Sequence, residues 1–176
     1  SYTVTVLDAN ANPVDGVDVV ADGFEGTAID INSEGDTATA TTDPTGNVEF
    51  TAVSTDAQAG VQLTFTEQIA NNGATAEATF QAGDPAEIEV EVTGTDATAD
   101  GKDEVEFTAT VTDANDNPVS GVQVLTTDDG TDVNYVGDDD QETNEDGEVT
   151  ITATSTTAQE AVAFTFEEQQ GGTSTD

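Results

Sequence analysis

The chain repeats itself, and this internal repeat restricts its fold more than any other feature of the sequence. Residues 1–19 align with residues 106–124 at an offset of 105, and residues 42–55 align with residues 143–156 at an offset of 101. Because the offset falls from 105 to 101, the first copy carries four extra residues between its two aligned blocks. A chain of 176 residues is long enough for two such copies to fold as separate domains of about 90 residues each.

Within the aligned blocks, apolar residues alternate with Thr, Asp and Glu, which is typical of strands that bury one face. Turn residues separate the strands at Asn12-Pro13, Asn117-Pro118, Asp43-Pro44 and Asp146-Gly147. No helix-length segment interrupts them, so we predict an all-β chain of two tandem antiparallel β-sandwiches. The rows expected to face the cores are Tyr2, Val4, Val6, Val48, Phe50, Ala52, Val61, Leu63 and Phe65 in the first copy, and Phe107, Ala109, Val111, Val149, Ile151, Ala153, Val162, Phe164 and Phe166 in the second.

The two copies start and stop at different points of the repeat. The second copy opens with a strand pattern at residues 88–92 that the first copy lacks, and the first closes with one at residues 75–80 that the second lacks. We expect domains at 1–83, with its opening strand missing, and at 84–176, with its closing strand missing and a flexible tail at 171–176. Because a lost strand leaves an unpaired edge, and because Met is absent, we expect a window on a longer array. The alternative is that neighbouring molecules supply the missing strands by β-strand addition.

The charge balance points to the solvent in which the chain folds. There are 38 acidic residues against a single base, Lys102, which gives a formal net charge of −37. In ordinary buffer this self-repulsion opposes a compact state, whereas near 1 M salt the Debye length falls to about 3 Å. We therefore predict a protein of an extreme halophile. Disorder is the compositional alternative, and the strand periodicity argues against it.

Composition also excludes several classes of function. A chain with one basic residue has nothing to replace phosphate counterions, so nucleic-acid binding is not expected. No apolar run of about 20 residues and no basic amphipathic helix occur, so we expect no direct membrane contact in this segment. His and Cys are absent, which excludes His-assisted nucleophiles and the usual zinc sites. We predict a non-enzymatic protein without catalytic residues or a cofactor.

The segments 8–12 and 113–117 superficially look like a calcium loop of the D-x-N-x-N type. An EF-hand loop needs Gly at its sixth position and Glu at its twelfth, but both copies have Pro and Val there. We therefore expect these Asp and Asn side chains to cap turns between strands. Phe24 and Tyr135 stand in the variable middle of each copy, where we expect them to close the end of a sandwich. Exposed contact residues are the alternative for this pair.

The densest acidic cluster supplies the candidate metal ligands. Several hard oxygen ligands would surround Ca²⁺ or Mg²⁺ if its loop folded back on itself. A solvated acidic loop is the alternative, and the even spread of acids elsewhere in the chain favours it. The candidates, which would bind Ca²⁺ or another cation weakly, are Asp128, Asp129, Asp132, Asp138, Asp139 and Asp140.

Three segments together resemble one known family. The junction between the copies reads F-Q-A-G-D-P-A-E-I at residues 80–88, a turn reads D-A-N-D-N-P-V-S-G-V at residues 113–122, and T-D-x-x-G stands at residues 42–46. They resemble the bacterial immunoglobulin-like group 1 repeats of the invasin and intimin type, although Ala11 and Asp116 replace the Gly usual in that turn. The resemblance implies immunoglobulin-like sandwiches, without catalytic residues, in a rod that holds a binding tip or a lattice away from a surface.

We therefore predict a structural or adhesive segment of an extracellular surface protein of an extreme halophile, such as a surface-layer protein or an adhesin stalk. Two alternatives stay open. One is a spike, turret or fibre protein on the virion of a virus infecting a halophilic archaeon, and the other is a pair of ancillary domains of a secreted enzyme. The expected location is the cell or virion surface, and the expected partners are neighbouring repeats of the parent chain or other surface or capsid subunits.

Overall fold

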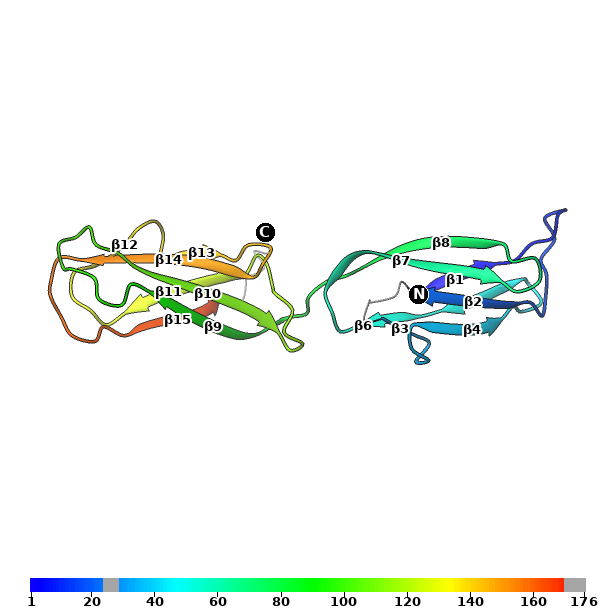
Figure 1. The fold of residues 1–176 in the computed structure, drawn as a ribbon, viewed down its shortest axis with the longest axis horizontal. Helices are drawn as coiled ribbons and strands as arrows, with labels where there is room; N and C mark the ends of the chain where they lie inside the picture. The colour runs from blue at the N-terminus through cyan, green and yellow to red at the C-terminus, as the bar shows by residue number, and fades with distance from the viewer. Residues whose placement is uncertain (24–28, 170–176) are drawn as a thin grey trace, which may run out of the picture. The chain divides into compact units, whose positions relative to one another are not determined.

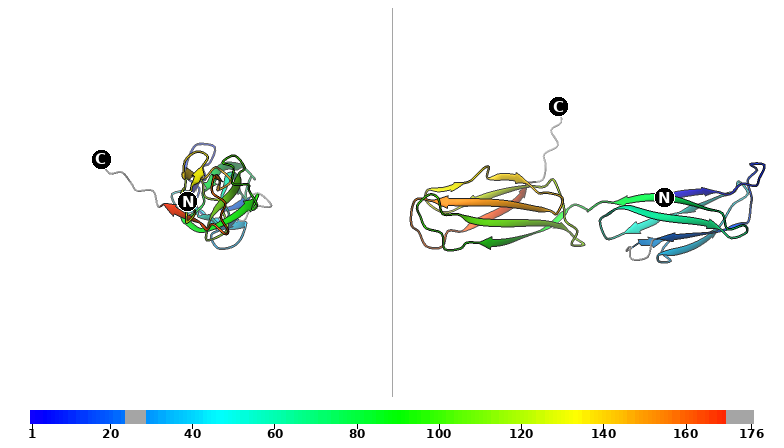
Figure 2. Two further views of the ribbon diagram at one scale, coloured as in Figure 1. Left: turned by 90° about the vertical axis from the view of Figure 1, so that its left-hand side faces the viewer. Right: turned by 45° about the horizontal axis from the view of Figure 1, so that its top comes forward.

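The computed structural model describes residues 1–23 and 29–169 of the chain. Over these residues the chain forms strands and turns, and it contains no helix long and apolar enough to cross a membrane. The chain divides into two compact units, Ser1–Gln81 and Ala82–Asp176. Figures 1 and 2 show the strands of each unit lying side by side, and every described pairing is antiparallel, as predicted.

The first unit packs one four-stranded sheet, of order β4-β2-β7-β8, against two short pairs, β1 with β5 and β3 with β6. β5 and β6 are separate because Thr51 between them bonds Asn32: the Asn32 N–H donates to the Thr51 carbonyl, and the Thr51 N–H donates to Asn32 Oδ1, both at 2.9 Å. The strands are β1 Tyr2–Thr5, β2 Asp18–Gly23, β3 Ile29–Ile31, β4 Thr37–Thr41, β5 Asn47–Phe50, β6 Ala52–Ser54, β7 Gln58–Glu67 and β8 Gly73–Phe80.

The second unit packs a four-stranded sheet, of order β12-β14-β10-β9, against a three-stranded sheet, of order β13-β11-β15. Its β14 runs unbroken where the first unit has β5 and β6. The strands are β9 Pro85–Thr93, β10 Val105–Asp113, β11 Gln123–Asp128, β12 Val133–Tyr135, β13 Asp140–Glu142, β14 Glu148–Ser155 and β15 Phe164–Gln169.

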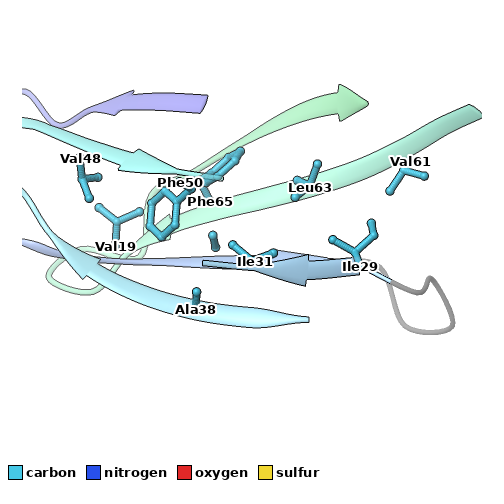
Figure 3. Packing of buried hydrophobic residues seen from close by; sticks show 10 residues of the cluster. Val19, Ile29, Ile31, Ala38, Val48, Phe50, Val61, Leu63 and Phe65 are labelled. Atoms are coloured by element: carbon cyan, nitrogen blue, oxygen red, sulfur yellow. The ribbon is translucent and has the colours of Figure 1, made fainter. Parts of the chain in front are cut away.

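The core of the first unit is built around two phenylalanine rings. Phe50 of β5 and Phe65 of β7 have ring centroids 5.6 Å apart. Figure 3 shows Leu63 and Val61 following Phe65 along β7, so one strand contributes a continuous row to the core. The buried apolar residues of this core are Val19, Ala21, Ile29, Ile31, Ala38, Val48, Phe50, Val61, Leu63 and Phe65.

The core of the second unit repeats this plan with Phe107 between Phe164 and Phe166, at ring-centroid distances of 4.4 and 5.4 Å. The buried residues are Phe107, Ala109, Val111, Val122, Val124, Val149, Ile151 and Ala153, which confirms most of the predicted inward rows. Four predicted inward positions of the first unit and three of the second depart from full burial, and Ala52 is one of the four. Tyr2, Val4 and Val6 of the first unit, and Val162, Phe164 and Phe166 of the second, are only half-buried.

A buried threonine hydroxyl ties each unit together at the same place. Thr42 Oγ1 accepts the N–H of Val17 at 3.0 Å and donates to the Val14 carbonyl at 2.8 Å. In the second unit Thr143 Oγ1 accepts the N–H of Val122 at 3.0 Å and donates to the Val119 carbonyl at 2.7 Å. Thr42 therefore bonds the backbone that leads into β2, and Thr143 bonds the backbone that leads into β11.

Candidate functional site

The segments 8–12 and 113–117 form the same turn in both units. Asp8 Oδ1 accepts the backbone N–H groups of Asn10 and Asn12 at 2.8 and 2.9 Å, and the Asn12 side-chain amide donates to both carboxylate oxygens. These bonds to the charged form lower the pKa of Asp8, the Asn12 side chain contributing most. The side chains cap a turn, as the sequence predicts.

The same turn in the second unit has one further partner. Asp113 accepts the N–H groups of Asn115 and Asn117 through Oδ1, and its Oδ2 accepts the backbone N–H of Gly83 at 2.7 Å. The Asn117 amide and the Gly83 N–H are the two largest causes that hold the pKa of Asp113 far below its usual range. Asp113 is buried, whereas Asp8 is exposed, because the chain that leads into β9 lies over Asp113.

Three residues of the candidate metal cluster, Asp128, Asp129 and Asp132, lie at the last residue of β11 and in the turn after it, where they close the end of the second unit. Asp128 Oδ1 accepts the N–H of Gly130 at 2.9 Å. Asp129 Oδ1 accepts the N–H of Ala163 at 2.8 Å, and Asp132 Oδ2 accepts the hydroxyl of Thr157 at 2.7 Å. Each carboxylate therefore faces a different neighbour instead of a shared centre.

The remaining candidates, Asp138, Asp139 and Asp140, lie at the start of β13. The Asp139 carbonyl accepts the N–H of Thr126 at 2.8 Å, and the Asp138 carbonyl accepts the Gln141 amide at 3.0 Å, so these residues join β13 to β11 and to its own turn. Within residues 1–23 and 29–169, no three acidic side chains come close enough to hold a metal ion together. Weak cation binding by this cluster stays a prediction.

Tyr135 packs its ring against the second core and donates its hydroxyl to Asp128 Oδ2 at 2.8 Å. Burial, and then the Asp128 carboxylate, raise the pKa of this phenol above its usual range. The residue thus helps to close the sandwich. Phe24, predicted to do the same in the first copy, lies outside the described residues.

β1 and β10 occupy the same position in their units but differ in their neighbours. β10 pairs with β14 on one side and β9 on the other, whereas β1 pairs with β5 alone among the described strands. As a result Val4 and Val6 are half-buried, while their counterparts Ala109 and Val111 are fully buried. Leu7, two residues after the end of β1, leaves 52% of its surface exposed. The free side of β1 is therefore an unpaired backbone edge flanked by apolar side chains.

A cavity of about 490 Å³ opens beside this edge. It is bounded by β1, by the start of β2 and by the turn between β7 and β8, with Val4, Val6 and Phe65 among its lining residues. In the second unit, Ile88 of β9 packs against the core opposite Val111, the counterpart of Val6. The cavity of the first unit therefore lies where the second unit places the side chain of Ile88.

At the other edge of the sandwich it is the second unit, not the first, that has one strand fewer among the described residues. β7 pairs with β2 and β8, whereas β15 pairs with β11 alone among the described strands. A cavity of about 440 Å³ lies beside β15, with Val92, Phe107 and Phe164 among its lining residues. Val90 and Val92 of β9 stand opposite the buried Ala109 and Phe107, so they share the inward face of the sheet, yet 39% and 43% of their surfaces are exposed. Their side of the sandwich lacks a described counterpart of β8.

The comparisons with known proteins agree with this geometry. Residues 87–176 match the family described as the bacterial Ig-like domain (group 1). No curated protein matches the chain at a significant level.

Several solved structures are similar to the chain at low sequence identity. The D0-D1 domain of intimin is 24% identical, over 89% of this chain and 75% of that one, with a TM-score of 0.38. Invasin, described as a bacterial integrin-binding protein, is 20% identical over 94% of this chain and 32% of its own, with a TM-score of 0.47. A glycosyl hydrolase family 2 member from Bacteroides cellulosilyticus DSM 14838 is 15% identical over 88% of this chain and 22% of its own, with a TM-score of 0.43. The family match, together with the packed antiparallel sheets of both units, confirms the predicted immunoglobulin-like fold.

Proposed function

Because this chain belongs to the bacterial Ig-like domain (group 1) family, we propose that it is a non-enzymatic structural or adhesive segment of an extracellular surface protein of an extreme halophile. In this role the units are spacers that hold a binding tip or a lattice away from a surface. The observation that carries the proposal is the tandem arrangement of two sandwich units of one repeat in a single chain.

The placement of the acids supports a role in concentrated salt. Among the described residues, Asp113 is the single acidic side chain that is buried, so nearly all of the formal charge of −37 lies on the surface. At about 1 M salt, with a Debye length of about 3 Å, such a surface barely repels itself, and its carboxylates still keep the molecule soluble. The same surface in dilute buffer would work against folding.

The acidic cluster at residues 128–140 supports a structural role more than a ligand site. Its side chains accept hydrogen bonds from Gly130, Ala163, Thr157 and Tyr135, all within the second unit. Groups that are already engaged in holding loops together have less capacity for a substrate or an ion.

The location can be tested with antibodies raised against the purified 176-residue chain. They should label intact cells of the source organism in high-salt medium without permeabilisation, because a surface segment is accessible from outside. Labelling that appears only after permeabilisation would contradict the proposal. Labelling of purified virus particles and not of uninfected cells would assign the chain to the virion instead, and co-purification with a hydrolase activity would assign it to a secreted enzyme.

A further inference from the structure

We infer that the outer edge of β8 in the first unit is an interface between two molecules of this chain, which pair their β8 strands antiparallel about a two-fold axis at Ala76. The occupant of the edge is the same strand of a second molecule. The inference goes beyond the proposed surface role, and it holds whichever surface carries the chain.

The outer side of β8 presents unpaired backbone groups. β8 ends the four-stranded sheet of the first unit and pairs with β7 alone among the described strands (Figure 1). The Glu67 N–H donates to the Asn72 carbonyl at 3.0 Å, just before β8 begins. Because hydrogen-bonded and non-hydrogen-bonded pairs alternate along an antiparallel ladder, Ala74 and Ala76 direct their backbone groups to β7. The residues between and beyond them, whose N–H and carbonyl groups face the free side, are Gly73, Thr75, Glu77 and Thr79.

β8 lacks the charges that protect an edge strand from pairing with another chain. β9 has three glutamates in nine residues and β15 has two in six, whereas β8 has one acid, Glu77, in eight residues. Other uncharged edge strands, such as β1 and β4, are only four and five residues long. Residues 57–83 contain two acids, although the whole chain contains 38 in 176 residues. Two molecules with a formal charge of −37 each therefore meet the least repulsion along β8.

The sequence of β8 selects one register for this pairing. Two identical antiparallel strands cross at one residue, which stands opposite itself, and a crossing at Glu77 would set two carboxylates against each other. With the crossing at Ala76, Glu77 stands opposite Thr75 of the second molecule, and the seven residues 73–79 pair without a like-charge contact. Crossings at Thr75 or Ala78 also separate the glutamates, but they pair only five residues. In the Ala76 register the free backbone groups of the two strands lie in hydrogen-bonded pairs.

The same contact covers apolar surface beside the edge. Ala74 is exposed although it shares the inward face of β8, where it stands opposite the buried Phe65. It also lines the cavity of about 490 Å³ together with Val4 and Val6 of β1. In the Ala76 register Ala74 stands opposite Ala78 of the second molecule. Pairing therefore removes apolar surface from water at the mouth of this cavity in both molecules.

The test uses the full chain, which contains no Cys, in about 2 M salt to screen the acids. Ala76→Cys places two thiols across the axis in a non-hydrogen-bonded pair, whose Cα atoms are about 4.5 Å apart and within reach of a disulfide. Ala78→Cys is the matched control, because Ala78 is half-buried on the same face but its two positions lie about 14 Å apart along the paired strands. With oxidised glutathione, Ala76→Cys should form a disulfide-linked dimer at least about tenfold faster than Ala78→Cys.

Thr75→Pro provides a second measurement. The Thr75 N–H faces the free side, so proline removes a donor to the second molecule and none to β7. Sedimentation equilibrium of the parent chain in about 2 M salt should show a monomer and dimer in equilibrium. Thr75→Pro should weaken the dimer by about tenfold or more, while far-ultraviolet circular dichroism still reports a folded chain. If this variant does not fold, the two cysteine variants still decide.

Three results would overturn the inference. A parent chain that stays monomeric at all concentrations would exclude the interface. Equal disulfide formation by Ala76→Cys and Ala78→Cys would show contact without a fixed register. A mass that grows beyond a dimer would show open-ended association through a different edge. Because these measurements use purified protein, their failure leaves the antibody test of surface location unaffected.

Discussion

Thr126 stands in the second unit at the position that Ala21 occupies in the first. Ala21 pairs with Phe65 across β2 and β7, and Thr126 pairs with Phe166 across β11 and β15. Both residues are fully buried, but the Thr126 hydroxyl has no hydrogen-bond partner among the described residues. The second core therefore holds a polar atom that the first core avoids with a methyl group.

Replacing this hydroxyl should stabilise the second unit. Thr126→Val keeps the shape and the β-branch while it removes the unpaired group, so the free energy of unfolding should rise by about 1 kcal/mol. Thr127→Val, on the exposed face of the same strand, should change it little. Urea unfolding in high salt measures both variants, and an unchanged or lower midpoint for Thr126→Val would indicate that the hydroxyl is bonded in solution.

Folding should depend on salt. With a charge of −37 that is almost entirely on the surface, the chain should show a cooperative melt by far-ultraviolet circular dichroism at about 2 M salt and lose it at about 50 mM, where the Debye length exceeds about 10 Å. Uncharged sucrose at matched water activity is the control. A full β-type spectrum with an unchanged melt at low salt would remove the charge argument for a halophilic source.

The inward rows should carry the stability of each unit. Phe107 lies on β10, the strand between β9 and β14, and its buried ring contacts Phe164 and Phe166. Phe107→Ala should therefore lower the free energy of unfolding by about 3–5 kcal/mol. Phe166→Ala should cost less, since its side chain is only half-buried. Thr110→Ala, on the outer face of β10, should cost little. Equal denaturation midpoints for the three variants would show that the strand phase is wrong.

Two glycines should be sensitive to substitution for a steric reason. Gly147 has φ +73°, and a Cβ there would lie 2.6 Å from the Val111 carbonyl oxygen. Gly121 has almost the same φ, +74°, with nothing within 4 Å of its Cβ position. Gly121→Ala should therefore lose about 1–2 kcal/mol from left-handed strain alone, and Gly147→Ala should lose clearly more. Thermal melts in high salt compare them, and equal losses would exclude the contact with Val111.

Asp113 and Asp8 are equivalent residues of the two units, but only Asp113 accepts the Gly83 N–H. We therefore expect the stability of the second unit to depend on pH more than that of the first. The folded state lowers the pKa of Asp113 below its unfolded value of about 3.9, so its contribution is complete above that value and fades as the pH falls through the folded pKa. Asp113→Asn should lower the denaturation midpoint at pH 7, because the amide would present N–H to the Gly83 donor or to Asn117. The difference from the parent chain should shrink below about pH 4 as Asp113 itself protonates.

Asp8→Asn is the matched control, since Asp8 makes the same turn without the Gly83 contact. It should lower stability less than Asp113→Asn does, and hydrogen exchange should localise the larger effect to residues 82–88. If the two variants behave alike at every pH, the Gly83 bond adds nothing to the turn.

The repeat was enough to predict the sandwiches, because the alternation at residues such as Phe50 and Ile151 is a local property of each strand. Burial at the edges could not be read in this way, since it depends on a strand far away in the sequence. Val90 alternates like a core residue yet is exposed, and the sequence shows the same D-A-N-x-N in both copies although only Asp113 is buried. The six candidate metal ligands were expected on one loop, but β12 divides them into two groups, with Asp128 ending β11 and Asp140 beginning β13, and this division depends on strand pairing that the acidic run does not show.

The Thr42 and Thr143 ties explain where this repeat can change without losing its fold. Each hydroxyl bonds the backbone just before β2 or β11 from a point beyond the variable middle segment, which differs by four residues between the copies. The hydrogen bonds of each threonine therefore hold the two ends of the variable segment together, whatever the length of the segment. Insertions and new surface residues can accumulate there during divergence while the core stays in register, so a site that distinguishes one copy from another would arise most easily in this segment. A Ser at either position should keep these hydrogen bonds because it retains the hydroxyl, whereas a Val should lose them.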